Sequence, residues 1–253
     1  MSRPFATSLQ VPAGALAPAL PPKRRAALAL LVILGTGVLV GLVFGLWPGL
    51  DLAVTALGFD PAQRMFTHAY TPSLQTIRDV NDIIVRAVAV TAGVILILWL
   101  AAPKVAAARL PGALSLRAAL FVLATLAVAP GLIVNGILKP HGGRPRPIEV
   151  TQFGGTLDFV PWWSPFGRCD ANCSFASGEM SSATWLLAVA VLLPARWRSL
   201  GIVAVLAWAL VVGGARMAQG GHFASDVLMS AVITALTVWG LHALILRPGE
   251  RTA

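Results

Sequence analysis

The stretch AALALLVILGTGVLVGLVFGLW, residues 26–47, decides the fold class because it runs for 22 residues without a charged side chain. A helix of that length crosses the roughly 30 Å hydrocarbon layer of a lipid bilayer. The apolar region of a signal peptide is shorter, about 7–15 residues, and a small-residue cleavage site normally follows it. We therefore expect residues 26–47 to form a retained transmembrane helix.

Five further apolar segments follow the first, which predicts an all-α polytopic membrane protein with six transmembrane helices. They span residues 83–102, 118–138, 178–193, 200–214 and 226–246. The composition agrees, because 57% of the 253 residues are hydrophobic and only 11% are charged, too few to cover a water-soluble core. This composition excludes a soluble enzyme.

The basic residues predict how the chain is oriented. Six crossings return the C-terminus to the side where the chain starts. If that side is inside, it carries eleven of the 19 Lys and Arg residues and one of the 10 acidic residues. The positive-inside rule then places both termini in the cytoplasm. The isoelectric point near 11.2 is thus explained by topology, and no nucleic-acid partner is expected.

The chain divides into a short tail and one domain. Residues 1–22 are rich in Ala and Pro and are expected to be a disordered cytoplasmic tail, and residues 23–253 to form a single six-helix membrane domain. The outer loop 48–81 is expected to lie at the membrane interface without crossing. Near its end Arg78, Asp82 and Arg86 are spaced i, i+4, i+8, which predicts a solvated ladder of ion pairs.

A second outer loop, residues 139–176, is long enough to be functional or disordered. Its adjacent Trp162 and Trp163 favour an ordered loop resting on the membrane interface. The loop also holds the two cysteines of the chain, Cys169 and Cys173. Because the predicted orientation puts them in an oxidising compartment, we expect them to form a disulfide.

Three clusters put charged or small polar residues where an apolar helix meets water on the outer side. They are KPHGGRPRP at 139–147, FASGE at 175–179 and ARMAQGGHFASD at 215–226. Each alone has an ordinary explanation as helix anchor, helix cap or solvated histidine. The topology brings all three to one membrane face, so they can form a single site.

The residue types in these clusters suit phosphate chemistry. Cleaving a phosphate monoester needs cations around its oxygens, a nucleophile in line with the leaving group and a proton for that group. Lys139, Arg146 and Arg216 are candidate cations, and arginine offers bidentate contacts. Ser177 and Gly178 open a helix, where unpaired backbone N–H groups favour an anion. Such a site needs no metal or other cofactor.

The nucleophile is expected to be His222. His222 and Asp226 are four residues apart at a helix entrance. At that spacing the carboxylate of Asp226 can accept one ring N–H and leave the other nitrogen of His222 free to attack phosphorus. A covalent phosphohistidine would follow.

Together the clusters resemble the signature of the type 2 phosphatidic acid phosphatase superfamily, K-x6-R-P, P-S-G-H and S-R-x5-H-x3-D. The matching residues are Lys139, Arg146, Pro147, Ser177, Gly178, Arg216, His222 and Asp226. The resemblance implies a metal-independent lipid phosphatase that acts through phosphohistidine in a bacterial inner membrane, at its periplasmic face. Its substrate would be a phosphorylated membrane lipid such as lipid A, undecaprenyl pyrophosphate or a phospholipid phosphate. Phosphomonoester hydrolysis, pyrophosphate hydrolysis and phosphate transfer to another lipid stay open.

Three positions depart from the signature: Ala176 replaces Pro, Ala215 replaces Ser and Glu179 replaces the His expected to protonate the leaving group. A Glu beside cations at a helix start should be ionised, the wrong state for an acid. Glu179 could be an acid protonated under a bound lipid or the base that activates water, or His141 could supply the proton. The runs S-F-x-S-G-E and R-x-A-Q-G-G-H-F-x-S-D resemble a bacterial subgroup that includes lipid A 4′-phosphatase-type proteins.

Three other functions compete with this one. Glu179 favours a catalytically silent lipid-phosphate binder. A membrane transporter would place ionisable residues near the bilayer midplane, whereas these lie at the outer rim. A rhomboid-type serine protease would need Gly at Phe175 and gives the three cations no role. Arg144 is expected to touch either substrate phosphate or lipid headgroups, and His242, at the inner end of the last helix, to be structural.

Overall fold

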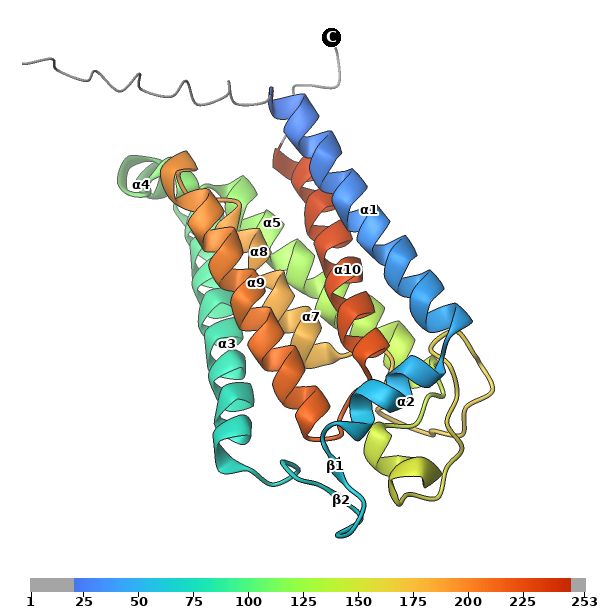
Figure 1. The fold of residues 1–253 in the computed structure, drawn as a ribbon. Coiled ribbons are helices and arrows are strands. Elements are labelled where there is room, and N and C mark those ends of the chain that lie inside the picture. The colour runs from blue at the N-terminus through green and yellow to red at the C-terminus, as the bar shows by residue number, and fades with distance from the viewer. Residues whose placement is uncertain (1–20, 247–253) are drawn as a thin grey trace, which may run out of the picture.

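The computed structural model describes residues 21–246, which form a helical bundle with one small hairpin (Figure 1). The expected tail, residues 1–22, lies outside the described residues except at its last two positions, where the first helix begins. Pro22 occupies the first turn of that helix, where its missing N–H removes no intrahelical hydrogen bond.

Five long helical segments build the bundle. They are α1 (Pro22–Leu46), α3 (Pro72–Ala101), α5 (Leu116–Leu126) continued by η2 (Ala127–Leu138) and α6 (Lys139–His141), α9 (Ala195–Ala218), and α10 (Ala224–Leu241) continued by η5 (His242–Leu246). Each is 23–30 residues long and apolar enough to cross a membrane. Large apolar side chains such as Leu31, Ile97 and Leu210 are more than 60% exposed on their outer faces, as expected for a lipid-facing surface. The chain is a multi-pass membrane protein.

The fourth predicted crossing, residues 178–193, differs from the other five. It forms two short helices, α7 (Gly178–Trp185) and α8 (Leu187–Ala190), so the described residues contain five helices long enough to span a membrane, not six. Figure 1 shows α7 and α8 inside the bundle, with α7 near the start of α10.

Polar side chains explain why α7 lies in the interior and not against lipid. Ser181 hydrogen-bonds Thr234 of α10 at 2.8 Å, and Ser182 accepts a hydrogen bond from the Asn81 amide of α3 at 2.9 Å. Trp185 is fully buried and its Nε1 donates to the Val122 carbonyl of α5 at 3.1 Å. Small residues let the helices approach closely, and hydrogen bonds join them in an apolar surrounding.

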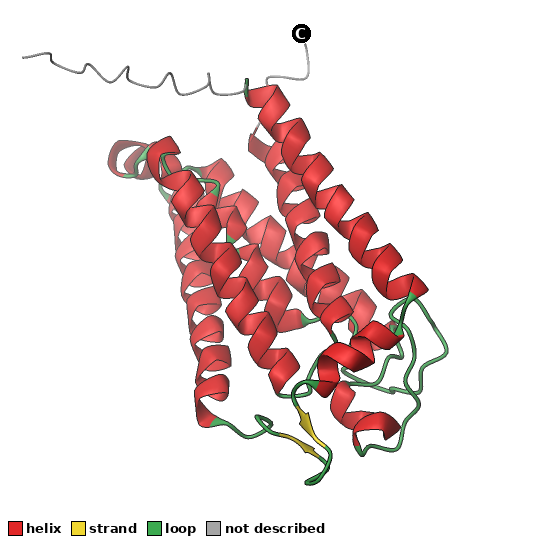
Figure 2. Cartoon of the chain, in the orientation of Figure 1, coloured by secondary structure: helices red, strands yellow, loops and turns green. Residues whose placement is uncertain are grey.

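The segment 48–81 makes no crossing of its own, as predicted. It consists of α2 (Gly49–Ala56), the antiparallel strands β1 (Phe59–Asp60) and β2 (Met65–Phe66), and the first turns of α3. The hairpin, yellow in Figure 2, is a small departure from an all-α fold. Short helices complete the connections: α4 (Pro103–Arg109), η1 (Gly112–Leu114), η3 (Pro147–Glu149) and η4 (Thr151–Phe153).

The third long segment becomes π-helical after residue 126. Pro130 lies within it and cannot donate a backbone hydrogen bond. The side-chain amide of Asn135 donates to the Pro130 carbonyl at 2.6 Å, which satisfies an acceptor in the widened turns. The segment thereby carries Asn135 and Lys139 to the start of α7.

Both described ends of the chain, where α1 begins and η5 ends, lie at one end of the bundle (Figure 1). The hairpin, α2 and the loop after α6 lie at the opposite end. Trp162 of that loop stacks on Phe175 with ring centroids 5.7 Å apart, and Trp163 Nε1 donates to the Gly45 carbonyl of α1 at 3.4 Å. The tryptophan pair therefore fixes the loop against the first helix.

Candidate active site

The predicted site residues meet at the end of the bundle that carries the hairpin. Lys139 follows η2, Gly178 opens α7, Arg216 lies in the last turn of α9 and His222 precedes α10. The three sequence clusters thus converge, because the segments that carry them end or begin on the same side.

The carboxylate of Glu179 lies at the centre of this site. Its Oε1 is 3.5 Å from Nε of Arg216 and 3.7 Å from Nε of Arg78, and its Oε2 is 3.6 Å from Nε2 of His222. The Glu179 side chain is 16% exposed. A carboxylate this close to two guanidinium groups is held in its ionised form.

Three buried atoms of the site have no hydrogen-bond partner among residues 21–246: Oε2 of Glu179, Nε of Arg216 and Nε2 of His222. A buried polar atom left unpaired costs about 1–3 kcal/mol, so such atoms are rare and call for an explanation. Their concentration at one point, with a mixture of donors and acceptors, indicates a place where a polar ligand binds.

His222 is fully buried, not exposed at a solvated rim. Its Nδ1 lies 2.8 Å from the Ser174 carbonyl, whereas the nearest carboxylate oxygen of Asp226 is 3.9 Å away. The prediction that Asp226 accepts the ring N–H is therefore wrong, and Ser174 has that role. Because a carbonyl only accepts hydrogen bonds, Nδ1 carries a proton. Burial lowers the pKa of His222, and in the neutral ring Nε2, which faces Glu179, is the unprotonated nitrogen.

Asp226 acts on His222 through Ser174. Its Oδ2 accepts hydrogen bonds from the Ser174 hydroxyl and from the backbone N–H of Phe223, the latter at 2.9 Å. The second contact caps the N-terminus of α10, where an anion is favoured. Asp226 therefore fixes the residue whose carbonyl orients the imidazole.

Arg144 contacts neither a phosphate site nor the membrane surface, so both alternatives considered for it are wrong. It is fully buried, with one guanidinium nitrogen 2.7 Å from Oδ2 of Asp51 and another ion-paired to Asp226. Its guanidinium also lies 4.3 Å from the ring centroid of Phe223. Arg144 thus joins α2 to the start of α10 beneath the site.

Asp51 is the partner that the sequence analysis missed. Its Oδ1 accepts the backbone N–H of Ser225 at 2.9 Å and its Oδ2 accepts the Ser225 hydroxyl at 2.6 Å. Burial raises the pKa of Asp51, and Arg144 opposes that effect. The sequence did offer one signal for this pair: Asp51 is the single acid in the apolar run GLDLAVTA. An acid in such a run is expected to be buried, and a buried carboxylate needs a cation as its partner.

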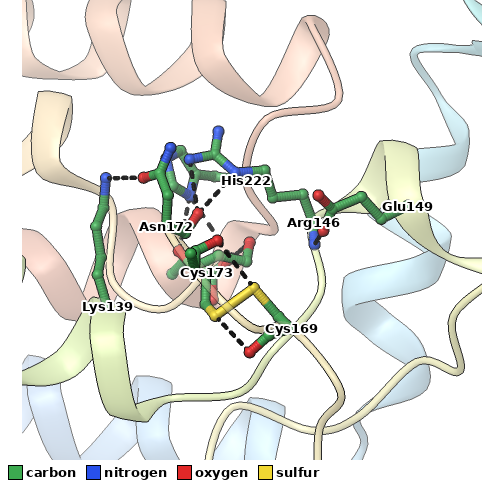
Figure 3. The surroundings of a disulfide bond; sticks show 10 residues. Lys139, Arg146, Glu149, Cys169, Asn172, Cys173 and His222 are labelled. Carbon is green, nitrogen blue, oxygen red and sulfur yellow. Dashed lines mark hydrogen bonds and ion pairs between the residues drawn. A yellow bond between two sulfur atoms is a disulfide. The ribbon is translucent and has the colours of Figure 1, made fainter.

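Lys139 and Arg146 approach Asn172 from opposite sides (Figure 3). Nζ of Lys139 donates to Oδ1 of Asn172 at 3.3 Å, and two guanidinium nitrogens of Arg146 donate to the Asn172 carbonyl at 3.1 and 2.9 Å. A disulfide between Cys169 and Cys173, as predicted, closes the loop that holds Asn172. Asn172 has a positive φ of 51°, a conformation that Asn tolerates better than most residues.

Ser177 and Gly178 shape the start of α7. The Ser177 hydroxyl accepts the backbone N–H of Met180 at 3.3 Å and so caps the helix. A Cβ atom on Gly178 would lie 3.0 Å from the Asn135 side chain and 3.2 Å from Nζ of Lys139. The glycine therefore lets Lys139 lie against the helix start, next to Glu179.

A family model described as the PAP2 superfamily matches residues 115–249. The chain belongs to the PAP2 superfamily. All three clusters lie within the matched region, which confirms the superfamily resemblance inferred from their spacing. Asp51 and Arg78 lie outside that region.

The chain is also similar to curated proteins named lipid A 4′-phosphatase. It is 42% identical to the one from Francisella tularensis subsp. novicida (strain U112) over 138 residues, 53% of this chain and 61% of that protein. It is 39% identical to the one from Rhizobium etli (strain ATCC 51251 / DSM 11541 / JCM 21823 / NBRC 15573 / CFN 42) over 122 residues, 48% of each. The matches thus span about half of the chain and 48–61% of these relatives. No solved structure matches the chain significantly.

Arg78 is a site residue that the sequence analysis assigned elsewhere. In this PAP2 protein Asp82 pairs with Arg86 at 3.6 Å, as the ladder predicted, but Arg78 is directed to Glu179. Arg78 shares a helix face with Asn81, three residues on, which contacts α7. The polar Asn81 inside an apolar helix was the signal that this face meets the site.

Two further predictions for this PAP2 site concern His141 and metal binding. His141, the alternative proton donor, is exposed on α6, whereas Glu179 adjoins the reacting nitrogen of His222. Within residues 21–246 no group of three or more His, Cys, Asp and Glu residues is arranged to hold a metal ion. The site offers guanidinium and ammonium groups for binding an anion.

Proposed function

We propose that this PAP2 protein is a lipid phosphatase that removes phosphate from a membrane lipid through a phosphohistidine on His222, without a metal. One observation carries the proposal: among residues 21–246 the buried Nε2 of His222 has no hydrogen-bond partner and lies 3.6 Å from the Glu179 carboxylate that Arg216 also contacts, while Nδ1 is fixed by the Ser174 carbonyl. A neutral imidazole held in one tautomer beside a cationic anion site is what an in-line attack on phosphorus requires.

The reaction follows from this arrangement. Arg216, Lys139 and Arg146 bind the phosphate oxygens, with the start of α7 adding backbone N–H groups. Nε2 of His222 attacks phosphorus, and the bond from phosphorus to the lipid oxygen breaks as that oxygen receives a proton. Water then attacks the phosphohistidine, the phosphorus–nitrogen bond breaks and inorganic phosphate leaves.

Lipid A is the substrate class with the strongest support. The similar proteins from Francisella and Rhizobium are named lipid A 4′-phosphatases. We therefore infer a sugar-linked lipid phosphate of the lipid A type, ahead of undecaprenyl pyrophosphate and phospholipid phosphates.

We further infer that the site faces the periplasm of a bacterial inner membrane. The charge pattern supports a cytoplasmic location for the opposite end of the bundle. The disulfide of Cys169 and Cys173 lies at the site end, and such bonds persist in oxidising compartments.

Release of phosphate from lipid A by the purified chain should continue in EDTA, and Arg216→Lys should reduce kcat/KM by about 10²-fold. The reason is that a lysine point charge cannot reproduce the fork of arginine. Phosphate release in detergent micelles measures both effects. Strict dependence on added Mg²⁺ would contradict the metal-free site, and binding of lipid A without phosphate release would favour a silent binder.

As the pH is lowered, kcat/KM should begin to fall only at a pH below the usual imidazole pKa of about 6.5. Burial lowers the pKa of His222, and the Glu179 and Asp226 carboxylates offset this only in part. The attacking nitrogen must be unprotonated, so activity persists as pH falls through 6.5 and is lost only below it. Rates are compared after correction for the substrate phosphate, whose second pKa is about 6. A fall that begins at or above pH 6.5 would argue against a buried neutral nucleophile.

A further inference from the structure

The carboxylate of Glu179 lies where a phosphate group would have to bind. It is 3.5 Å from Arg216 and 3.6 Å from Nε2 of His222, the cation and the nucleophile that a reacting phosphate must contact. Phosphorus must come within about 3–3.5 Å of the attacking nitrogen. Substrate therefore cannot reach Nε2 while the Glu179 carboxylate stays in place.

The charges around Glu179 make the exchange of one anion for another favourable. Arg78 of α3, Lys139 at the start of α6, Arg216 of α9 and His222 before α10 all face it, from four different elements. Before phosphate binds, the Glu179 carboxylate neutralises charge on Arg78, Lys139 and Arg216, and His222 faces it as a neutral imidazole. With a phosphate dianion among the same cations, a second anion is repelled, and like-charged carboxyl and phosphate groups cannot both stay ionised at such short range.

We propose that Glu179 is the resting occupant of the phosphate site and that incoming phosphate displaces its carboxylate from Arg216, so that Glu179 takes up a proton and becomes the acid for the leaving group. This inference rests on the proposed phosphatase function and deepens it. It explains how a Glu that is ionised in the free protein serves where the superfamily signature has His.

Over one turnover Glu179 takes up one proton from solvent and returns one proton to solvent. One proton from solvent joins Glu179 as the phosphate dianion binds, and it passes to the lipid oxygen when the phosphorus–oxygen bond breaks and the nitrogen–phosphorus bond forms. The ionised Glu179 then takes a proton from the water whose oxygen attacks phosphorus, and the electron pair of the broken phosphorus–nitrogen bond returns to Nε2. As product phosphate leaves, Glu179 releases that proton and returns to Arg216.

Binding of inorganic phosphate to the purified full chain tests the exchange without any lipid. Calorimetry at pH 8 in two buffers with different ionisation enthalpies gives the number of protons taken up. We expect about one proton per phosphate for the wild-type protein and about none for Glu179→Gln, which should also bind phosphate at least about 10-fold more tightly because the competing anion is gone. The control Asp82→Asn, whose carboxylate pairs with the exposed Arg86, should behave like wild type.

A second measurement needs no variant. If binding takes up one proton, the inhibition constant of phosphate for the wild-type protein should rise about tenfold per pH unit above pH 8, where free phosphate is already a dianion. Equal affinity and equal proton uptake in wild type and Glu179→Gln, or inhibition independent of pH, would overturn the exchange. Proton-coupled phosphate binding without hydrolysis of any lipid phosphate would instead overturn the proposed function and leave the anion exchange standing.

Discussion

Replacing His222 by Gln should abolish release of phosphate from the lipid, with a loss in kcat of about 10⁴-fold or more. The substitution removes the imidazole Nε2, the atom proposed to form the covalent bond to phosphorus. Gln is a better test than Ala because His222 is fully buried, and Gln fills more of the space that the imidazole occupies. Rapid quenching with ³²P-labelled lipid should label wild-type protein and leave His222→Gln unlabelled.

The matched control for this experiment is His68→Gln. His68 is exposed after the hairpin, where its ring contacts the Thr71 hydroxyl at 3.3 Å. The His68→Gln variant should keep the full phosphatase activity and the full ³²P labelling of the wild-type protein. Labelling of His222→Gln to the wild-type level would remove His222 as the nucleophile.

Replacing Arg144 by Met should lower the free energy of unfolding by about 3–5 kcal/mol, because it leaves the Asp51 and Asp226 carboxylates buried close to one another with no cation. Arg86→Met is the control, since Arg86 and Asp82 form an exposed pair, 78% and 44% accessible, whose loss should cost less than about 1 kcal/mol. Unfolding in detergent micelles, followed by helical circular dichroism, compares the two variants.

A second substitution separates charge from packing at Arg144. Asp51→Asn in the Arg144→Met background removes one of the two stranded charges and should recover part of the lost stability. If Arg144→Met unfolds like Arg86→Met, the buried ion pairs do not stabilise the bundle.

The sequence predicts those features that a local pattern encodes. Long apolar runs predict α1, α3, α5 with η2, α9 and α10, because spanning a bilayer requires about 20 apolar residues in succession. Motif spacing predicts that Lys139, Arg216 and His222 meet, since it fixes which helix ends share a membrane face. Compartment chemistry predicts the disulfide.

What the sequence leaves open depends on contacts between distant segments. The acceptor for His222 is the backbone carbonyl of residue 174. Any residue type at that position supplies a carbonyl, so the sequence does not identify this acceptor. The sequence predicts a phosphate or headgroup contact for Arg144, because its actual partner Asp51 is 93 residues away and does not show in the local pattern. The break between α7 and α8 is hidden in an apolar run, because the hydrogen bonds that hold Ser181 and Ser182 come from other helices.

The link between Asp51 and Arg144 limits how the protein can be divided or recombined. The superfamily match begins at residue 115, yet Asp51 in α2 supplies a counter-ion for Arg144 and an acceptor for the Ser225 backbone N–H. A chimera that joins the half matched by the superfamily to an unrelated N-terminal half would contain a buried arginine lacking one of its two carboxylates. The two halves therefore depend on each other. A replacement N-terminal half must carry an acidic residue at the position that Asp51 occupies in α2.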